Sequence, residues 1–99
     1  MSSQQKIVEQ ILDELKRAKK KFPTWPTDPV HCAAVIGEEA GEVIQAALDF
    51  FYGRAASRAR MREEALQVGA MAIRFLEGLE NKRCRRKIAR NRTGTAGRE

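Results

Sequence analysis

Apolar side chains recur at intervals of three and four residues near the start of the chain. The repeating positions are Ile7, Val8, Ile11, Leu12, Leu15, Ala18 and Phe22. This spacing places them on one face of a helix, because residues three or four apart lie above one another along the helix axis. The pattern predicts an amphipathic helix from about residue 4 to residue 21. It should end before Pro23, since proline restricts the residue before it.

A second helix is predicted after the proline-rich stretch FPTWPTDP, which favours an extended connector. Thr27 or Asp28 followed by Pro29 is typical of a helix start. The side-chain oxygen accepts from a free backbone N–H, and proline in the first turn lacks the hydrogen that would go unpaired. We expect this helix to run from about Pro29 to Tyr52, with Gly53 ending it.

A third helix is predicted after Ser57, which is a suitable N-cap, and it should continue to about Gly78 or slightly beyond. Its apolar and small positions are Met61, Ala65, Leu66, Val68, Gly69, Ala72, Ile73, Phe75, Leu76 and Leu79. No segment shows the strict alternation of apolar and polar residues that is typical of a half-buried strand. The sequence therefore predicts an all-α fold with three main helices.

The second and third predicted helices carry more apolar surface than three helices in so short a chain can cover. Small residues that permit close helix approach are Ala33, Ala34, Gly37, Ala40, Gly41, Ala47, Gly69, Ala70 and Ala72. Large apolar residues on the same helices are Ile44, Leu48, Phe51, Phe75 and Leu76. We expect a homodimer or a dimer of dimers, because a symmetric partner would cover this surface.

The net charge of +6 over 99 residues is unevenly distributed. Residues 1–80 contain 11 Lys and Arg against 12 Asp and Glu, whereas residues 81–99 contain eight basic residues and one acidic residue. A chain of this length forms one domain. We expect a helical domain over residues 1–80 and a basic, partly disordered C-terminal tail over residues 81–99.

Two further features limit the class of protein. No run of about 18 apolar residues is present, and the N-terminus lacks the layout of a signal peptide, so a cytoplasmic protein without membrane contact is predicted. Cys32 and Cys84 are far apart, and no CxxC motif is present. Neither a disulfide framework nor a zinc site is indicated.

Two groups of acidic residues occur at helical spacing. Glu39 and Glu42 are three residues apart, so they point to the same side of the second helix, about 60° apart, with Glu38 beside them. Glu64 and Gln67 have the same spacing on the third helix. The second helix contains no Lys or Arg that would balance its charge.

Carboxylates at helical spacing most often form a solvated face, but two such pairs on consecutive helices favour another role. Antiparallel helices would set the pairs opposite each other and surround one point with three carboxylates and one amide oxygen. Like charges in a partly buried cluster repel each other unless a cation balances them. Oxygen ligands of this kind suit Mg²⁺ or Mn²⁺.

The segments GEEAGE and EEALQV together resemble the MazG-like, all-alpha nucleoside triphosphate pyrophosphohydrolases, whose signature is EExxE, a spacer, then ExxD. In this chain EExxE is Glu38, Glu39 and Glu42, and the spacer of 21 residues runs from 43 to 63. The resemblance covers about residues 29–79. It implies a helical bundle formed by dimers or higher oligomers, dependence on Mg²⁺, and hydrolysis of an NTP or dNTP to the monophosphate and pyrophosphate.

The resemblance also implies roles for individual residues. Glu39, Glu42, Glu64 and Gln67 match the metal-ligand positions, with Gln67 standing where the family has Asp. An amide oxygen can coordinate a metal ion but brings no negative charge, which leaves the activity in question. Glu38 or Glu39 is the candidate for orienting the attacking water.

Candidates for substrate binding lie on the first helix, the connector and the third helix. Lys21 and Arg62 are candidates for binding phosphate, within a basic set that also includes Lys19, Lys20, Arg58 and Arg74, although each also fits a solvated surface charge. Trp25 is a candidate for stacking on a nucleobase, and it also fits a cover over the helical core. His31 lies one turn from the acidic face and fits a surface or capping position.

A second function from another class remains open at this stage. The chain would be a non-enzymatic MazG-like helical oligomer whose basic tail binds nucleic acid. Gln67 and the charge of the tail favour it, whereas the other retained acidic positions oppose it. A tail without interleaved aromatic residues attracts phosphate but offers little base recognition, so only weak nucleic-acid contact is expected from it.

Overall fold

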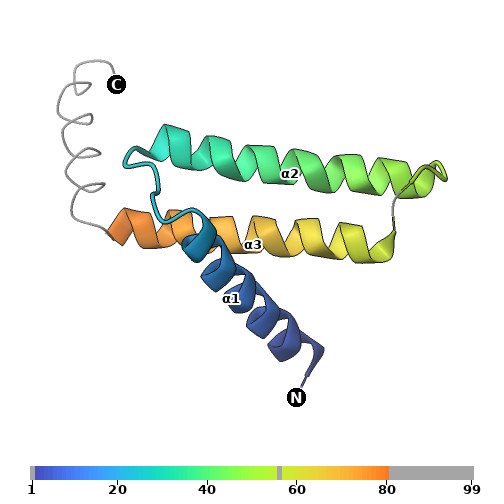
Figure 1. Cartoon of the computed structure of the whole chain (residues 1–99), viewed down its shortest axis with the longest axis horizontal. Coiled ribbons are helices and arrows are strands. Elements are labelled where there is room, and N and C mark those ends of the chain that lie inside the picture. Colours follow the sequence, from blue (N-terminus) through green and yellow to red (C-terminus); the bar gives the residue numbers. More distant parts are fainter. Residues whose placement is uncertain (1, 56, 81–99) are drawn as a thin grey trace, which may run out of the picture.

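The computed structural model describes residues 2–55 and 57–80, which form three helices and contain no strand. They are α1 (Ser3–Lys21), α2 (Pro29–Phe51) and α3 (Arg58–Glu80). Helices α2 and α3 lie side by side as an antiparallel hairpin, and α1 crosses α3 obliquely (Figure 1). The prediction of three main helices is confirmed within this part of the chain. The predicted tail, residues 81–99, lies outside it.

The helix starts follow from local capping chemistry. The Asp28 side chain accepts a hydrogen bond from the His31 backbone N–H at 2.9 Å, so Asp28 and not Thr27 is the N-cap of α2, and Pro29 occupies the first turn as predicted. The Ser57 hydroxyl likewise accepts from the Arg60 backbone N–H at 3.1 Å. At the start of α1, Ser2 and Gln5 form a reciprocal capping box, which places this start slightly earlier than the apolar pattern predicted.

The turn between α2 and α3 is held by one acidic residue. Gly53 has a positive φ of 70°, a backbone conformation that costs glycine little, and it follows α2 after its C-cap residue Tyr52. The Asp49 carboxylate accepts from Arg54 Nε at 3.1 Å and from Arg60 Nη1 at 3.2 Å. Gln45 also donates to it, at 2.9 Å. The bond from Arg60 joins the end of α2 to the start of α3, and the bond from Arg54 ties the turn to the end of α2.

The core is small and lies mainly where α3 meets its neighbours. Leu15, Ala70 and Met71 are buried together, and Ala18, Trp25, Val35, Ile36 and Ile73 pack around them. Helices α1 and α3 pack tightly at Gly69, because a Cβ built there would lie 3.1 Å from the Cδ1 atom of Ile11. Close packing of this kind fixes the position of α1 on α3.

The outer face of α2 remains uncovered in the single chain. Ile44 and Phe51 are 62% and 78% exposed, and Leu48 and Val30 are also exposed. Gly37 and Gly41 lie on an open part of the helix: apart from their own helix backbone and chain neighbours, no atom comes within 4 Å of where a Cβ would be. The expected surplus of apolar surface is therefore present, on the side of α2 that is free of other described residues. None of the described helices combines the length and apolar character needed to cross a bilayer.

Candidate metal centre

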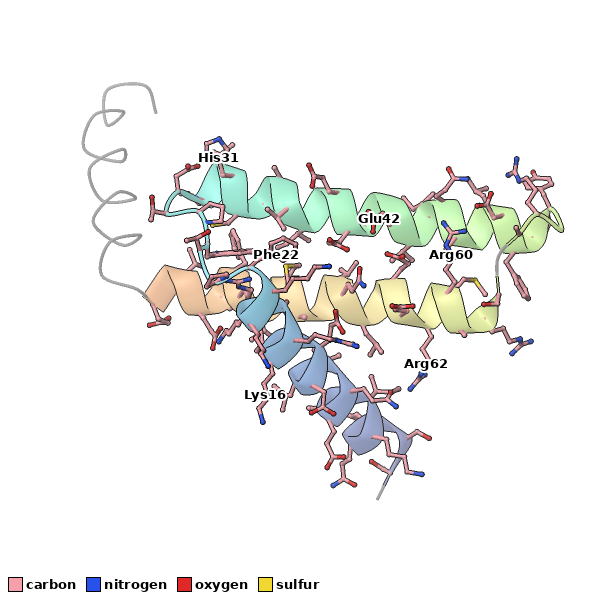
Figure 2. The ribbon with its side chains drawn as sticks, viewed as in Figure 1. Lys16, Phe22, His31, Glu42, Arg60 and Arg62 are labelled. Carbon is pink, nitrogen blue, oxygen red and sulfur yellow. The ribbon has the colours of Figure 1, made fainter. Side chains whose placement is uncertain are left out.

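Three carboxylates from two helices come together between α2 and α3. One oxygen of each of Glu39, Glu42 and Glu64 lies within 4.8 Å of the other two. Glu42 lies about midway along α2 (Figure 2). The three-residue spacing aims Glu39 and Glu42 at the same side of α2, and the antiparallel hairpin brings Glu64 of α3 opposite them. We call these three residues the carboxylate cluster.

The carboxylate cluster is electrostatically costly when it is fully charged. Within the described residues, Glu39 Oε2 and Glu64 Oε2 are buried and have no hydrogen-bond partner. Burial, followed by the charge of Glu42, raises the pKa of Glu39 above its ordinary value. A hydrogen bond to Glu42, followed by burial and by the nearby charge of Glu42, raises the pKa of Glu64 to about 6. A proton or a cation would relieve this repulsion.

The donor atoms of the carboxylate cluster fit a hard divalent cation. All three are carboxylate oxygens. In Glu39 and Glu64, one carboxylate oxygen is buried and accepts no hydrogen bond. Oxygen ligands select Mg²⁺, Mn²⁺ or Ca²⁺ over metals that prefer nitrogen or sulfur. The residues present therefore fit a bound cation of this group, Mg²⁺ and Mn²⁺ included.

A cavity of about 650 Å³ opens beside the carboxylate cluster. Glu39 and Glu42 line it, as do Glu38 of α2 and Glu63 and Gln67 of α3. Its wall also includes the basic residues Arg17, Lys21 and Arg74 and the indole of Trp25. A single cavity thus presents acidic, basic and aromatic groups to whatever enters it.

The structure distributes the predicted site residues unevenly. Gln67, Glu38, Lys21 and Trp25 all line the cavity that contains Glu39 and Glu42. Arg62 lies outside it: its guanidinium donates to Gln10 of α1, and it points away from α2 (Figure 2).

The predicted surface position of His31 is also observed. Its side chain is exposed, and its Nδ1 atom contacts Asp28 at 2.5 Å. This contact belongs to the start of α2, so His31 is part of the helix cap.

Sequence reasoning missed two charged residues of the cavity wall, Arg17 and Glu14, and did not rank Arg74 above other basic residues. Glu14 is buried and paired with Arg17. Arg74 shares a helix face with Ala70 and Met71, both of which are buried. The sequence signal that would have identified Arg74 is a charged residue on an apolar helix face. Glu14 gives the same kind of signal on α1, where it stands beside the buried Leu15.

Arg74 and Trp25 form a stacked pair in the cavity wall. The guanidinium carbon of Arg74 lies 4.6 Å from the centre of the Trp25 ring. Burial lowers the pKa of Arg74, and the charge of Glu77 opposes this shift. The stacking partly replaces the water that this guanidinium loses on burial.

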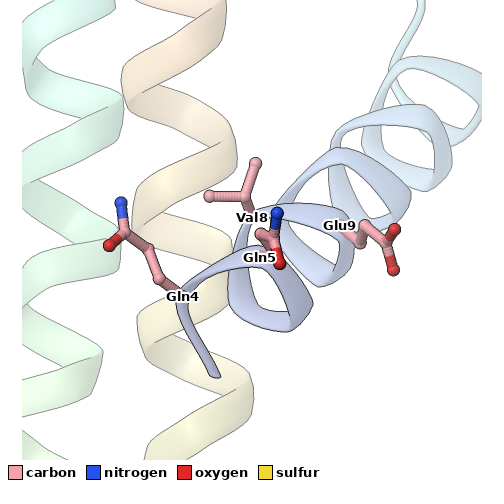
Figure 3. A pocket seen from close by; sticks show the side chains of 4 residues that line it. All are labelled: Gln4, Gln5, Val8 and Glu9. Carbon is pink, nitrogen blue, oxygen red and sulfur yellow. The ribbon is translucent and has the colours of Figure 1, made fainter. Parts of the chain in front are cut away.

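A second, shallow hollow of about 310 Å³ lies near the start of α1 (Figure 3). Gln4, Gln5, Val8 and Glu9 line it, and none of them belongs to the predicted site. It holds one carboxylate and no basic side chain, so it offers little chemistry of its own.

Comparison with known proteins adds no relative: no protein-family model, curated protein or solved structure matches this chain.

Proposed function

We propose that the protein is a Mg²⁺- or Mn²⁺-dependent nucleotide pyrophosphohydrolase that cleaves an NTP or dNTP to the monophosphate and pyrophosphate. The observation that carries the proposal is the carboxylate cluster of Glu39, Glu42 and Glu64, whose oxygens lie within 4.8 Å of one another beside a cavity of about 650 Å³. The resemblance of GEEAGE and EEALQV to the MazG-like signature supports the same function.

Each residue of the site has a part in this proposal. Glu39, Glu42 and Glu64 would hold the metal ion, and Gln67, three residues after Glu64 on α3, would add its amide oxygen. The bound ion would neutralise charge on the phosphate oxygens. Glu38 lines the cavity beside Glu39, and either carboxylate can accept a hydrogen bond from water and orient it for attack on the α-phosphorus.

Self-association is part of the proposal. The exposed apolar face of α2, with Ile44, Leu48 and Phe51, supports a homodimer or a dimer of dimers, because water would otherwise contact this face. A second copy on this face would also stiffen the helix that carries Glu39 and Glu42.

The decisive experiment is an assay of pyrophosphate release from a panel of NTPs and dNTPs with Mg²⁺. We expect release from at least one nucleotide, and loss of it when EDTA removes the metal. Glu42→Gln should abolish release, whereas Glu9→Gln, on the exposed face of α1, should not change it. No release from any nucleotide by the folded protein, or full activity of Glu42→Gln, would overturn the proposal.

A further inference from the structure

Arg74 is a buried cation without a carboxylate partner among the described residues. Only 6% of its surface is exposed, yet it lines the cavity that contains Glu39 and Glu42. Glu77, whose charge acts on Arg74 from one turn further along α3, forms its ion pair with Lys19 at 2.9 Å, and Glu14 of the cavity wall forms its ion pair with Arg17. A guanidinium retained in such a place costs free energy unless an anion completes its surroundings.

Trp25 determines how Arg74 can be used. Its ring lies 4.6 Å from the guanidinium carbon, which places the guanidinium over the face of the indole. The indole edge is held against α3 at Gly78, where a Cβ would lie 3.4 Å from Trp25 Nε1. A guanidinium stacked in this way keeps its N–H donors, which point outward in its plane and match two oxygens of a phosphate group.

We propose that Arg74 is the oxyanion-binding residue of the cavity and that Trp25 is its positioning residue. The ligand group is a phosphate or pyrophosphate moiety. The carboxylates of Glu39 and Glu42 and the guanidinium of Arg74 line one cavity, and Glu39 Oε2 is buried without a hydrogen-bond partner. A phosphate group on a bound metal ion would bring a cation to the carboxylates and an anion to the guanidinium. The bound metal ion and the identification of this group as part of a nucleotide rest on the proposed function.

This assignment changes the role expected of Trp25. One face of its ring is already covered by Arg74, and its edge lies against Gly78, so Trp25 contributes less to stacking on a nucleobase than a free aromatic side chain would. Phosphate recognition at Arg74 replaces base recognition at Trp25.

The test is calorimetric titration of the full-length protein with inorganic pyrophosphate in the presence of Mg²⁺. Arg74→Met should weaken binding about tenfold or more, because it keeps the length of the side chain and removes the charge and the paired donors. Arg74→Lys should weaken it less, since the charge remains but the fork of donors is lost. Arg58→Met, at the exposed start of α3, is the matched control and should bind like the unchanged protein.

The positioning role of Trp25 has its own comparison. Trp25→Phe keeps a flat ring face for the guanidinium and should retain binding within about twofold, whereas Trp25→Leu should lose about as much as Arg74→Met. Equal affinity in Trp25→Leu and Trp25→Phe would overturn this role. Circular dichroism of each variant separates loss of binding from loss of fold.

A measurement without substitutions covers the case in which Arg74→Met does not fold. Trp25 is the only tryptophan of the chain, so its indole N–H gives a single resonance. Saturating pyrophosphate should shift this resonance and the Arg74 Nε–H resonance. Unmoved resonances at saturation, or equal pyrophosphate affinity in Arg74→Met and the unchanged protein, would overturn the inference. So would a shift of the indole signal by a nucleoside that lacks phosphate and not by pyrophosphate.

The two proposals fail in different ways. If pyrophosphate binding depends on Arg74 but no nucleotide is hydrolysed, the oxyanion site stands and the proposed function falls. If nucleotides are hydrolysed but Arg74→Met binds pyrophosphate like the unchanged protein, the proposed function stands and the oxyanion site falls.

Discussion

Glu42 of α2 and Glu64 of α3 meet across the helix hairpin, with one oxygen of each within 4.8 Å of the other. They are 22 positions apart in the sequence, and the antiparallel course of the two helices brings them together. Protonated Glu64 can donate to Glu42, and this bond, with burial and the charges around it, raises the pKa of Glu64 to about 6. The free energy of unfolding should therefore depend on the protonation of this pair and on any cation bound beside it.

The first prediction concerns the pH dependence of stability without metal. Because the pKa of Glu64 rises from 4.5 to about 6 on folding, the folded protein binds this proton more tightly than the unfolded chain. The resulting stabilisation is fully present below pH 4.5 and is lost as pH rises through about 6. Glu39 acts in the same direction. Urea unfolding in EDTA should show this fall in the free energy of unfolding.

Glu64→Gln is the comparison for that measurement. Glutamine does not titrate, so the difference in stability between this variant and the unchanged protein should change between pH 4.5 and 6. A difference that stays constant across this range would contradict the shifted pKa of Glu64.

The second prediction is that Mg²⁺ or Mn²⁺ stabilises the folded protein at neutral pH. The cation replaces repulsion within the carboxylate cluster by attraction, and it binds only where folding has assembled that cluster. At a metal concentration 100 times the Kd, the gain in the free energy of unfolding should be about 2.7 kcal/mol. Glu42→Gln should remove this gain while leaving the metal-free protein at least as stable. An equal gain in Glu42→Gln would place the metal elsewhere.

Gln67→Asp is the third prediction. Gln67 lines the cavity beside the carboxylate cluster, and a carboxylate there adds the negative charge that the amide lacks. We expect tighter Mg²⁺ binding in calorimetry, together with lower stability in EDTA because one more like charge enters the cluster. Mg²⁺ affinity unchanged from that of the parent protein would show that position 67 does not contribute to the metal centre.

The fourth prediction concerns the turn. Asp49→Asn removes the negative charge that pairs with Arg54 and Arg60, whose side-chain nitrogens lie 3.1 and 3.2 Å from the Asp49 oxygens. The substitution should lower the free energy of unfolding by about 1–2 kcal/mol. Asp13→Asn, on the exposed side of α1, is the matched control and should change it by less than about 0.5 kcal/mol. Chemical unfolding measures both variants. A loss in Asp49→Asn no larger than that in Asp13→Asn would show that the contacts of Asp49 do not stabilise the fold.

The fifth prediction is self-association through α2. Sedimentation should give a mass of two or four chains, and Ile44→Lys should shift the protein toward the monomer, because it places a charge in the centre of the exposed apolar face. Asp13→Lys changes the charge on α1 and should leave the mass unchanged. A well-folded monomer at micromolar concentration for the unchanged protein would contradict this prediction.

Local features of the sequence determined the three helices. The apolar spacing, the Asp28–Pro29 start, the Ser57 cap and the glycine after α2 act over a few residues, so their effect can be read without knowing the fold. The pairing of Glu39 with Glu42 is local in the same sense. The position of Glu64 opposite them needed one more step of reasoning: the link between α2 and α3 is short, so the two helices should be antiparallel.

Contacts between distant segments decided the rest of the site. Arg74 belongs to the cavity because α3 packs against the connector that carries Trp25, and Arg17 joins it because Ile11 meets Gly69 and sets the course of α1 across α3. No residue spacing encodes these crossings. They depend on which side chains fit together at the core, and that fit exists only once the three helices have packed.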